Sequence, residues 1–451
     1  MKGAITKYVC TECGKEESKW MGRCPNCGAW NSFIEDITLP QSKGEVELPI
    51  MDGEVRNLSD IRIDEQVTIS SQITEFDRVV GTGIMRPSSV LVGGEPGIGK
   101  STLMLQVLSN VSQHHKVLYI SGEESPSQVK MRALRLELNL NGISMFCDTR
   151  VEAIENAIKK IKPALVVVDS LQTLTISSVP SIAGSPTQVK TCSLALTLLA
   201  KKENFALFLV GHITKEGAIA GPKIIEHMVD TVLYFEQTND SSVRFLRASK
   251  NRFGSVDELG IFSMEEKGLI PVQDPTAFFI SSREEGKLPS GIAFSAVVEG
   301  SRTFLVEIQA LTVPAKSGIS RIYSDKIDIA RVSRVAAILE RHANLNFNNQ
   351  DIYINIAGGM KVKEVSIELP LALALYSALT QKPLPEKLVT FGELSLAGEI
   401  RPIAYLDKRV KACVNMGFER IIVPPKSSIS EDVKYLYSKD VKQVFKIIIA
   451  M

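Results

Sequence analysis

Apolar residues along the chain occur partly in short continuous runs and partly at helical spacings. Segments with helical periodicity separate the continuous runs, which cover residues 90–93, 117–121, 164–169, 205–211 and 231–235. Strands that are apolar on both faces are typical of a parallel sheet with helices on both sides. The pattern therefore predicts an α/β domain with a parallel sheet over residues 66–272.

A different pattern follows residue 273. It predicts a second α/β domain over residues 273–451, with strands near 291–298, 304–311 and 351–357 and helices near 329–342 and 366–379. Residues 36–65 are acidic, poor in aromatic residues and interrupted by proline and glycine, which favours a linker. Residues 1–35 contain a cluster of cysteines and form a predicted third module.

Length and charge narrow the class of protein. A chain of 451 residues has room for roughly three domains. Its 52 basic and 51 acidic residues give a net charge of +1, which excludes a histone-like protein, so nucleic-acid binding has to be argued from motifs. We expect a cytoplasmic protein without a membrane segment, because the N-terminus lacks an apolar signal region and no apolar stretch approaches about 18 residues.

Four cysteines form two closely spaced pairs, Cys10 with Cys13 and Cys24 with Cys27. Two Cys-x-x-Cys pairs offer four thiolates, which is a typical ligand set for a tetrahedral structural Zn²⁺ site. An iron–sulfur cluster or redox-active cysteines are the alternatives. The pairs therefore predict a four-cysteine zinc finger over residues 1–35.

Aromatic and basic residues flank these cysteines. Trp20, Arg23 and Trp30 could stack on a nucleic-acid base or on a protein partner. In so small a module they could equally form its core.

A phosphate-binding loop follows the first apolar run of the larger α/β domain. The pattern G-x-x-x-x-G-K-[ST] is matched by Gly94, Glu95, Pro96, Gly97, Ile98, Gly99, Lys100 and Ser101. Thr102 then opens a helical pattern, which is the context that this motif requires. The sequence predicts ATP binding, in which Lys100 neutralises the β- and γ-phosphates and Ser101 ligates Mg²⁺.

Carboxylates follow two further strands of the predicted sheet. Asp169 ends an apolar strand in the manner of a Walker B residue, which holds Mg²⁺ directly or through water. Glu123 ends the strand between the two motifs and is the predicted base that activates water, with Glu124 as the alternative. Either glutamate could instead favour only the start of the next helix.

Several motifs together resemble one family. The cysteine pairs, the phosphate-binding loop, the pentapeptide from Lys250 to Gly254 and the segment 211–222 are similar to those of the RadA (Sms) family of bacterial DNA-repair proteins. The resemblance covers essentially the whole chain. It implies a RecA-like ATPase core between a zinc module and a Lon-protease-like α/β domain.

The resemblance also implies a function. Members of the family are DNA-stimulated ATPases of homologous recombination that extend strand exchange by branch migration alongside the RecA recombinase. The resemblance implies a homo-oligomer, expected to be a hexameric ring, on single-stranded DNA and branched recombination intermediates. Lys250 and Arg252 would reach a neighbouring subunit's γ-phosphate, as an arginine finger does; a basic surface turn is the alternative.

Two segments of the ATPase domain occupy positions where recombinase-type ATPases carry mobile DNA-binding loops. These are residues 176–188 and 212–223, with basic residues at Lys190, Lys215 and Lys223. Surface loops without a ligand are the alternative. Gln172, just after Asp169, is a candidate sensor of the γ-phosphate.

The C-terminal domain departs from the Lon pattern where a Lon protease has its catalytic serine and lysine. Ile367 and Asp407 stand at these two positions, so the match predicts an inactive protease fold. Ser366 and Lys408 would restore the pair if the alignment were shifted by one residue. The domain also carries basic residues for DNA binding, or for an ordinary solvated surface, at Lys361, Lys363, Arg401, Lys408, Arg409 and Lys411.

Two other functions remain open on the residues alone. One is an ATP-dependent protease with a zinc targeting module, against which the missing serine and lysine argue. The other is an ATP-gated scaffold of the clock-ATPase type, which turnover indifferent to DNA would favour.

Overall fold

The computed structural model describes residues 5–38, 57, 59, 68–211, 224–237, 242–272, 280–281, 288–315, 320–425 and 435–450. Contacts within the chain divide it into two compact units, with the main boundary between residues 272 and 273. The predicted loop 212–223 lies outside the described residues. So does nearly all of the predicted linker, residues 36–65. No helix within the described ranges is both long and apolar enough to cross a membrane.

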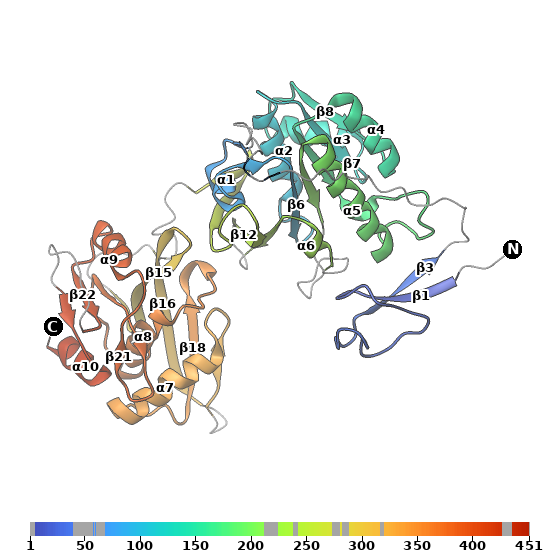
Figure 1. The fold of residues 1–451 in the computed structure, drawn as a ribbon. Coiled ribbons are helices and arrows are strands. Elements are labelled where there is room, and N and C mark those ends of the chain that lie inside the picture. The colour runs from blue at the N-terminus through green and yellow to red at the C-terminus, as the bar shows by residue number, and fades with distance from the viewer. Residues whose placement is uncertain are drawn as a thin grey trace. The chain divides into compact units, whose positions relative to one another are not determined.

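The N-terminal module is a three-stranded antiparallel sheet. Its strand order is β2-β1-β3, with β1 at Ile5–Cys10, β2 at Glu16–Glu17 and β3 at Phe33–Thr38. Cys10 ends β1, while Cys24 lies in the long connection between β2 and β3. The fold of the module therefore brings the two cysteine pairs together. Figure 1 shows β1 and β3 side by side.

The next domain is built on a nine-stranded sheet in the order β14-β13-β12-β11-β6-β10-β9-β7-β8 (Figure 1). Six neighbouring strands are parallel, and five of them lie at the predicted apolar runs: β6 (Ser88–Gly94), β7 (Val117–Ser121), β9 (Leu165–Asp169), β10 (Ala206–Val210) and β11 (Thr231–Gln237). The sixth, β8 (Ile143–Phe146), was not predicted. Their carboxyl ends share one edge, because Ser121 and Val210 both pair with Asp169 in the register.

Helices cover both faces of this sheet. Alternate strand residues pack against α1 (Thr74–Val80), α2 (Lys100–Val111) and α3 (Pro126–Arg135) on one face. The intervening residues pack against α4 (Val151–Ile161), α5 (Pro186–Glu203) and α6 (Ile224–Met228) on the other. The strands inside the parallel part are thus buried on both sides, which is the physical reason for their continuous apolar runs, whereas the edge strand β8 is only partly buried. A short antiparallel pair, β4 (Thr68–Ile69) with β5 (Ile84–Met85), precedes the sheet.

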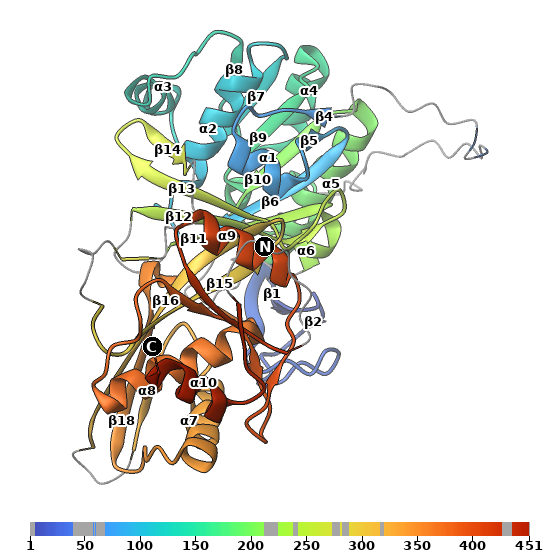
Figure 2. The same ribbon diagram turned by 90° about the vertical axis from the view of Figure 1, so that its left-hand side faces the viewer.

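The remaining three strands of the sheet are antiparallel, which the prediction of a parallel sheet missed. They are β12 (Val243–Asn251), β13 (Leu259–Glu265) and β14 (Gly268–Pro271). Their connections are too short for a parallel crossover, so the chain turns back directly. In Figure 2, β14 lies next to α2, where the Gln106 side chain hydrogen-bonds both backbone groups of Leu269.

The C-terminal domain has a seven-stranded mixed sheet in the order β17-β18-β16-β15-β19-β22-β23. The strands are β15 (Ile292–Glu299), β16 (Arg302–Pro314), β17 (Ile322–Ser324), β18 (Gln350–Ile356), β19 (Leu388–Thr390), β22 (Arg420–Val423) and β23 (Tyr435–Tyr437). A small hairpin pairs β20 (Glu393–Leu394) with β21 (Ile400–Arg401). The helices are α7 (Ile329–Ala343), α8 (Glu368–Thr380), α9 (Leu406–Asn415) and α10 (Val441–Ile449).

Candidate functional site

The phosphate-binding loop joins β6 to α2 and is fixed by close packing. Gly99 has φ 114°, in the left-handed region that favours glycine. A Cβ there would lie 2.7 Å from Cε of Met264, so the loop packs directly on β13. Arg244 of β12 adds a second support, because its Nε donates a hydrogen bond to the carbonyl of Ile98 at 3.2 Å. The loop is therefore held from the side of the antiparallel strands.

Lys100 is the first residue of α2, and its side chain turns back into the loop. Its ammonium donates hydrogen bonds to the carbonyl oxygens of Gly94 at 2.7 Å and Glu95 at 2.9 Å. Burial lowers the pKa of Lys100 to about 8, and the negative charges of Asp169, Glu123 and Glu95 only partly offset that effect. A phosphate in the loop would supply the missing counter-charge.

Asp169 lies buried at the end of β9, close to this lysine. Its Oδ2 accepts a hydrogen bond of 2.6 Å from the Tyr119 hydroxyl of β7. Burial and the neighbouring Asp169 both raise the pKa of Tyr119, so this hydroxyl stays protonated and serves as a donor. The aspartate is thereby oriented toward the carboxyl edge of the sheet, and with the Ser101 hydroxyl it offers oxygen ligands of the kind that Mg²⁺ prefers.

The two glutamates after β7 have different partners. Glu123 is exposed, and its Oε1 accepts a short hydrogen bond from the Ser170 hydroxyl, next to Asp169. Glu124 forms an ion pair with Arg132 of α3. Only Glu123 is thus held toward the Walker B strand.

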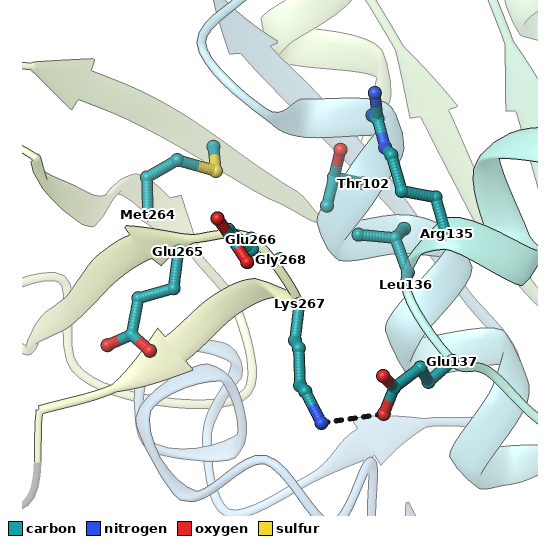
Figure 3. A pocket seen from close by; sticks show the side chains of 9 residues that line it. All are labelled: Thr102, Arg135, Leu136, Glu137, Met264, Glu265, Glu266, Lys267 and Gly268. Atoms are coloured by element: carbon teal, nitrogen blue, oxygen red, sulfur yellow. Dashed lines mark hydrogen bonds and ion pairs between the residues drawn. The ribbon is translucent and has the colours of Figure 1, made fainter.

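A pocket of about 520 Å³ adjoins the loop (Figure 3). Thr102 lies on one wall, and Leu136 and Met264 face the space from α3 and β13 (Figure 3). Its open side carries an ion pair of 2.7 Å between Lys267 and Glu137, drawn as a dashed line in Figure 3. The lining is mixed, with charged residues around the two apolar side chains Leu136 and Met264. A pocket of this volume beside a phosphate-binding loop is large enough for a nucleoside.

Lys250 and Arg252 lie at the other edge of the sheet. Asn251, between them, pairs with Thr231 at the start of β11, whereas Gly94 pairs with Phe235, about 13 Å further along the strand. Lys250 donates hydrogen bonds to three carbonyls at the end of α6, those of residues 226, 227 and 229. Arg252 is more than half exposed and contacts Asp230 at 3.1 Å.

The four N-terminal cysteines come together as predicted. Their sulfur atoms all lie within 4.8 Å of one another. In each pair the backbone N–H of the following glycine donates to the carbonyl of the first cysteine, Gly14 to Cys10 at 2.8 Å and Gly28 to Cys24 at 2.9 Å. Both glycines have φ above 70°, so the two turns are equivalent in shape. Such paired turns are suited to tetrahedral Zn²⁺.

The crowding of the sulfur atoms changes their acidity. A backbone hydrogen bond from Ala29 lowers the pKa of Cys27, but burial and the neighbouring thiols raise it to about 12. A cluster of four thiolates therefore needs a cation, which a divalent metal supplies.

Comparisons with known proteins agree with this arrangement. Residues 8–35 match the family described as a rubredoxin metal binding domain, residues 63–218 an AAA domain, and residues 323–427 subunit ChlI of Mg-chelatase. The DNA repair protein RadA of Treponema pallidum is 48% identical over 419 residues, which are 92% of this chain and 91% of that protein. The RadA proteins of Listeria monocytogenes and Bacillus subtilis are 43% and 42% identical, over 98% and 93% of this chain and 97% and 92% of theirs.

The chain belongs to the RadA family of DNA repair proteins. The resemblance and the α/β fold class with a zinc module, an ATPase core and a Lon-like C-terminal domain are thus confirmed. The roles assigned to single residues stay predictions.

Two expectations for this RadA-family chain need correction from the structure. Residues 176–188 are not a mobile loop, because the buried Gln188 amide hydrogen-bonds the backbone of residues 176, 179 and 181. Ile176 and Val179 also pack into the core, which leaves Ile182 exposed at the tip. Trp20 and Trp30 do not form a core in the zinc module, since they are 53% and 71% exposed.

Arg409 is a third correction, because it is buried and does not belong to a basic surface. It is 1% exposed and pairs with Glu364, while the other five basic residues named with it are solvent-accessible. Ser366 donates a hydrogen bond to Glu364 at 3.1 Å and accepts one from Arg409 at 3.2 Å. Lys408 points elsewhere, over the ring of Tyr405.

The positions of Ser366 and Lys408 test the alignment shifted by one residue, in which these two residues would form the serine–lysine pair. Ser366 meets Arg409, not Lys408, so the structure does not bring together the serine and lysine that a Lon-type dyad needs. Ile367 is fully buried and Asp407 is exposed.

Sequence reasoning missed three supporting residues of the RadA nucleotide edge. The Tyr119 hydroxyl orients Asp169, and the Ser170 hydroxyl orients Glu123. Arg244 supports the phosphate-binding loop. Ser170 directly follows Asp169 and could have been suspected. Tyr119 and Arg244 lie within strands and give no signal until the register is known.

Proposed function

We propose that this RadA-family chain is a DNA-stimulated ATPase that promotes branch migration of recombination intermediates together with the RecA recombinase. The observation that supports it most is the edge where the phosphate-binding loop, Asp169 and Glu123 meet around the buried Lys100. The repair role follows from the family, whose curated members are DNA repair proteins.

ATP would bind with its phosphates in the loop from Gly94 to Ser101. Lys100 would exchange its two loop carbonyls for β- and γ-phosphate oxygens. Ser101 and Asp169 would hold Mg²⁺, which neutralises phosphate charge. The adenosine would enter the neighbouring pocket between Leu136 and Met264.

Glu123 would act as the base for water. It is exposed at the carboxyl edge of the sheet, and Ser170 orients its carboxylate. Glu124 is less suited to this role because it is paired with Arg132. A positioned base of this kind accelerates a reaction by about 10²–10⁴-fold.

A ring of subunits, expected to be a hexamer, would complete the site. Arg252 lies at the opposite edge of the sheet from its own phosphate-binding loop, so it can serve a nucleotide only on a neighbouring subunit. Its exposed guanidinium suits that role better than Lys250, whose ammonium already caps three carbonyls. Lys250 would then position the strand end that carries Arg252.

Single-stranded DNA and branched intermediates are the proposed substrates, and the cytoplasm is the proposed location because zinc-binding thiols need a reducing compartment. The C-terminal domain would act as a scaffold without protease activity. Ser366 there contacts the buried Arg409, which also pairs with Glu364, and within the described residues it does not contact a lysine. Exposed lysines at 361, 363, 408 and 411 remain candidates for DNA contact.

The branch-migration proposal is tested with a labelled three-strand exchange started by RecA. Once joint molecules have formed, the wild-type chain with ATP should increase the rate at which they extend. The Lys100→Ala variant should leave that rate at the level of RecA alone. Equal extension with both proteins would remove ATP-driven branch migration from the account.

A further inference from the structure

A second pocket of the ATPase domain lies at the edge where the parallel strands begin. Its volume is about 520 Å³, and the connections before β6, β7, β9 and β10 line it. The lining residues, here called the strand-start pocket, are Arg86, His114, His115, Lys116, Lys162, Pro163, Ala164, Lys202, Glu203 and Asn204. The phosphate-binding loop is at the opposite ends of these strands, so this pocket is separate from the nucleotide site.

Positive charge dominates the strand-start pocket. Arg86, Lys116, Lys162 and Lys202 are permanent cations, and Glu203 is the one carboxylate among the lining residues. Three helices, α2, α4 and α5, end beside the pocket, and their C-termini together contribute roughly −1.5 charges. That is too little to neutralise an excess of three cations, so capping of the helices does not account for the cluster.

The cationic groups are positioned to meet a ligand. Arg86 is anchored by two hydrogen bonds from its guanidinium to the carbonyl of Asn204, at 2.9 and 3.2 Å. Lys116, Lys162 and Lys202 are exposed and extend from three separate connections. Burial, then the charges of Arg86 and His114, lowers the pKa of His115.

The lining also indicates the kind of anion. It offers no tyrosine, tryptophan or phenylalanine on which a base could stack, and only Pro163 and Ala164 are apolar. Separate lysines on flexible stems suit repeated point charges, such as those along a sugar-phosphate chain. An acidic peptide would need apolar anchors that this pocket lacks.

We propose that the strand-start pocket binds backbone phosphates of single-stranded DNA, as a second DNA contact at the edge of the sheet opposite the nucleotide site. The inference rests on the proposed function in so far as DNA is the source of the phosphates. It places one DNA contact on the rigid ends of core elements, independent of the segments 176–188 and 212–223.

The test compares two triple variants of the full chain that lose the same charge. Lys116→Gln with Lys162→Gln and Lys202→Gln empties the pocket of its lysines. Lys159→Gln with Lys160→Gln and Lys201→Gln alters the last turns of α4 and α5 without touching the lining. Binding of a fluorescent oligothymidylate is measured by anisotropy at several salt concentrations.

The pocket variant should bind the oligonucleotide at least about tenfold more weakly, and its log–log salt slope should fall by about two, since each lost phosphate contact removes roughly 0.7. The control variant should change affinity less than about threefold. Both should keep the ATP turnover measured without DNA. If the pocket variant loses that turnover, the single change Lys202→Glu at the exposed end of α5 gives the same comparison against Lys201→Glu.

Three results would overturn the inference. Equal weakening in both variants would show an effect of overall charge, and unchanged binding in the pocket variant would place DNA elsewhere. If the pocket substitutions weaken the binding of polyglutamate but not that of oligothymidylate, the ligand of the pocket is an acidic protein instead. If the wild-type chain does not bind DNA at all, the proposed function fails together with the inference. If it binds DNA and only the pocket substitutions have no effect, the inference alone fails.

Discussion

Buried charge is concentrated in a few residues at the carboxyl edge of the ATPase sheet. Lys100 is 4% exposed and Asp169 is 7% exposed, and a tyrosine hydroxyl donates to the aspartate. Burying an ammonium is unfavourable unless opposite charge is near. Two backbone carbonyls accept hydrogen bonds from Lys100, and its burial lowers its pKa. This residue is thus prepared for a phosphate that restores its full charge.

Proton uptake is the first expected consequence. The pKa of Lys100 is about 8 in the nucleotide-free protein, and bound triphosphate favours the charged form and raises it. ATP binding should therefore take up a proton at pH 9 but not at pH 7, and affinity should fall with rising pH above 8, by at most about tenfold per pH unit. Calorimetric titration in two buffers of different protonation enthalpy measures this.

The matched control is Lys100→Arg, because a guanidinium keeps its proton at pH 9 and should abolish the uptake. Binding by the wild-type chain without proton uptake at pH 9 would show that Lys100 is already fully charged.

Glu123 and its neighbour Glu124 provide a second test at the scale of single residues. Glu123→Gln should lower ATP turnover by about 10²–10⁴-fold while nucleotide affinity changes little, because the amide cannot accept a proton from water. Glu124→Gln, which only loses an ion pair with Arg132, should keep most of the activity. The reverse ranking in a steady-state assay would assign the base to Glu124.

Secondary-structure elements determine which residues can meet. The register between β11 and β12 places Arg252 at the edge opposite the phosphate-binding loop, so we expect it to act only on the nucleotide of a second subunit. In the C-terminal domain, α9 turns Arg409 inward and Lys408 outward. Neighbouring positions on one helix therefore differ in burial.

The position of Arg252 predicts a loss of hydrolysis without a loss of binding. Arg252→Ala should reduce turnover by about 10³-fold or more, as removal of a finger supplied in trans does. Arg247→Ala, on the strand β12 that precedes Arg252, is the control and should have little effect. Mixing Arg252→Ala with Lys100→Ala protein should restore some turnover, since a mixed ring joins an intact loop to an intact finger; no recovery would argue against action between subunits.

Arg409 leads to a prediction about stability. Arg409→Ala should lower the free energy of unfolding by about 3 kcal/mol, because it leaves Glu364 without its guanidinium and opens a cavity. Lys408→Ala should change it by less than about 0.5 kcal/mol. Urea unfolding followed by circular dichroism compares the two, and similar values would mean that the Arg409 pair contributes little.

The same contrast shows what a sequence can predict. Continuous apolar runs located five of the six parallel strands, all but the half-buried edge strand β8, and the glycine-lysine-serine pattern located the start of α2. Burial on both faces and phosphate binding each restrict residue type strongly. The antiparallel direction of β12, the strands β13 and β14 and the burial of Arg409 escaped prediction. Their cause is tertiary, in pairing partners far away along the chain.

At the scale of the whole molecule, three modules with separate chemistry lie on one chain. A four-cysteine module, an ATPase core and a C-terminal domain of Lon-like fold each match a known family. We expect DNA to control ATP turnover by the ATPase core. Arg252 and the strand-start pocket both lie at the edge of the sheet opposite the phosphate-binding loop.

The most direct test is ATP turnover by the purified chain with and without single-stranded DNA, at several salt concentrations, with Lys100→Ala as the blank. We expect DNA to stimulate turnover several-fold, the stimulation to fade as salt rises, and the blank to be inactive. Turnover that Lys100→Ala abolishes but that DNA leaves unchanged would contradict the account and favour an ATP-gated scaffold.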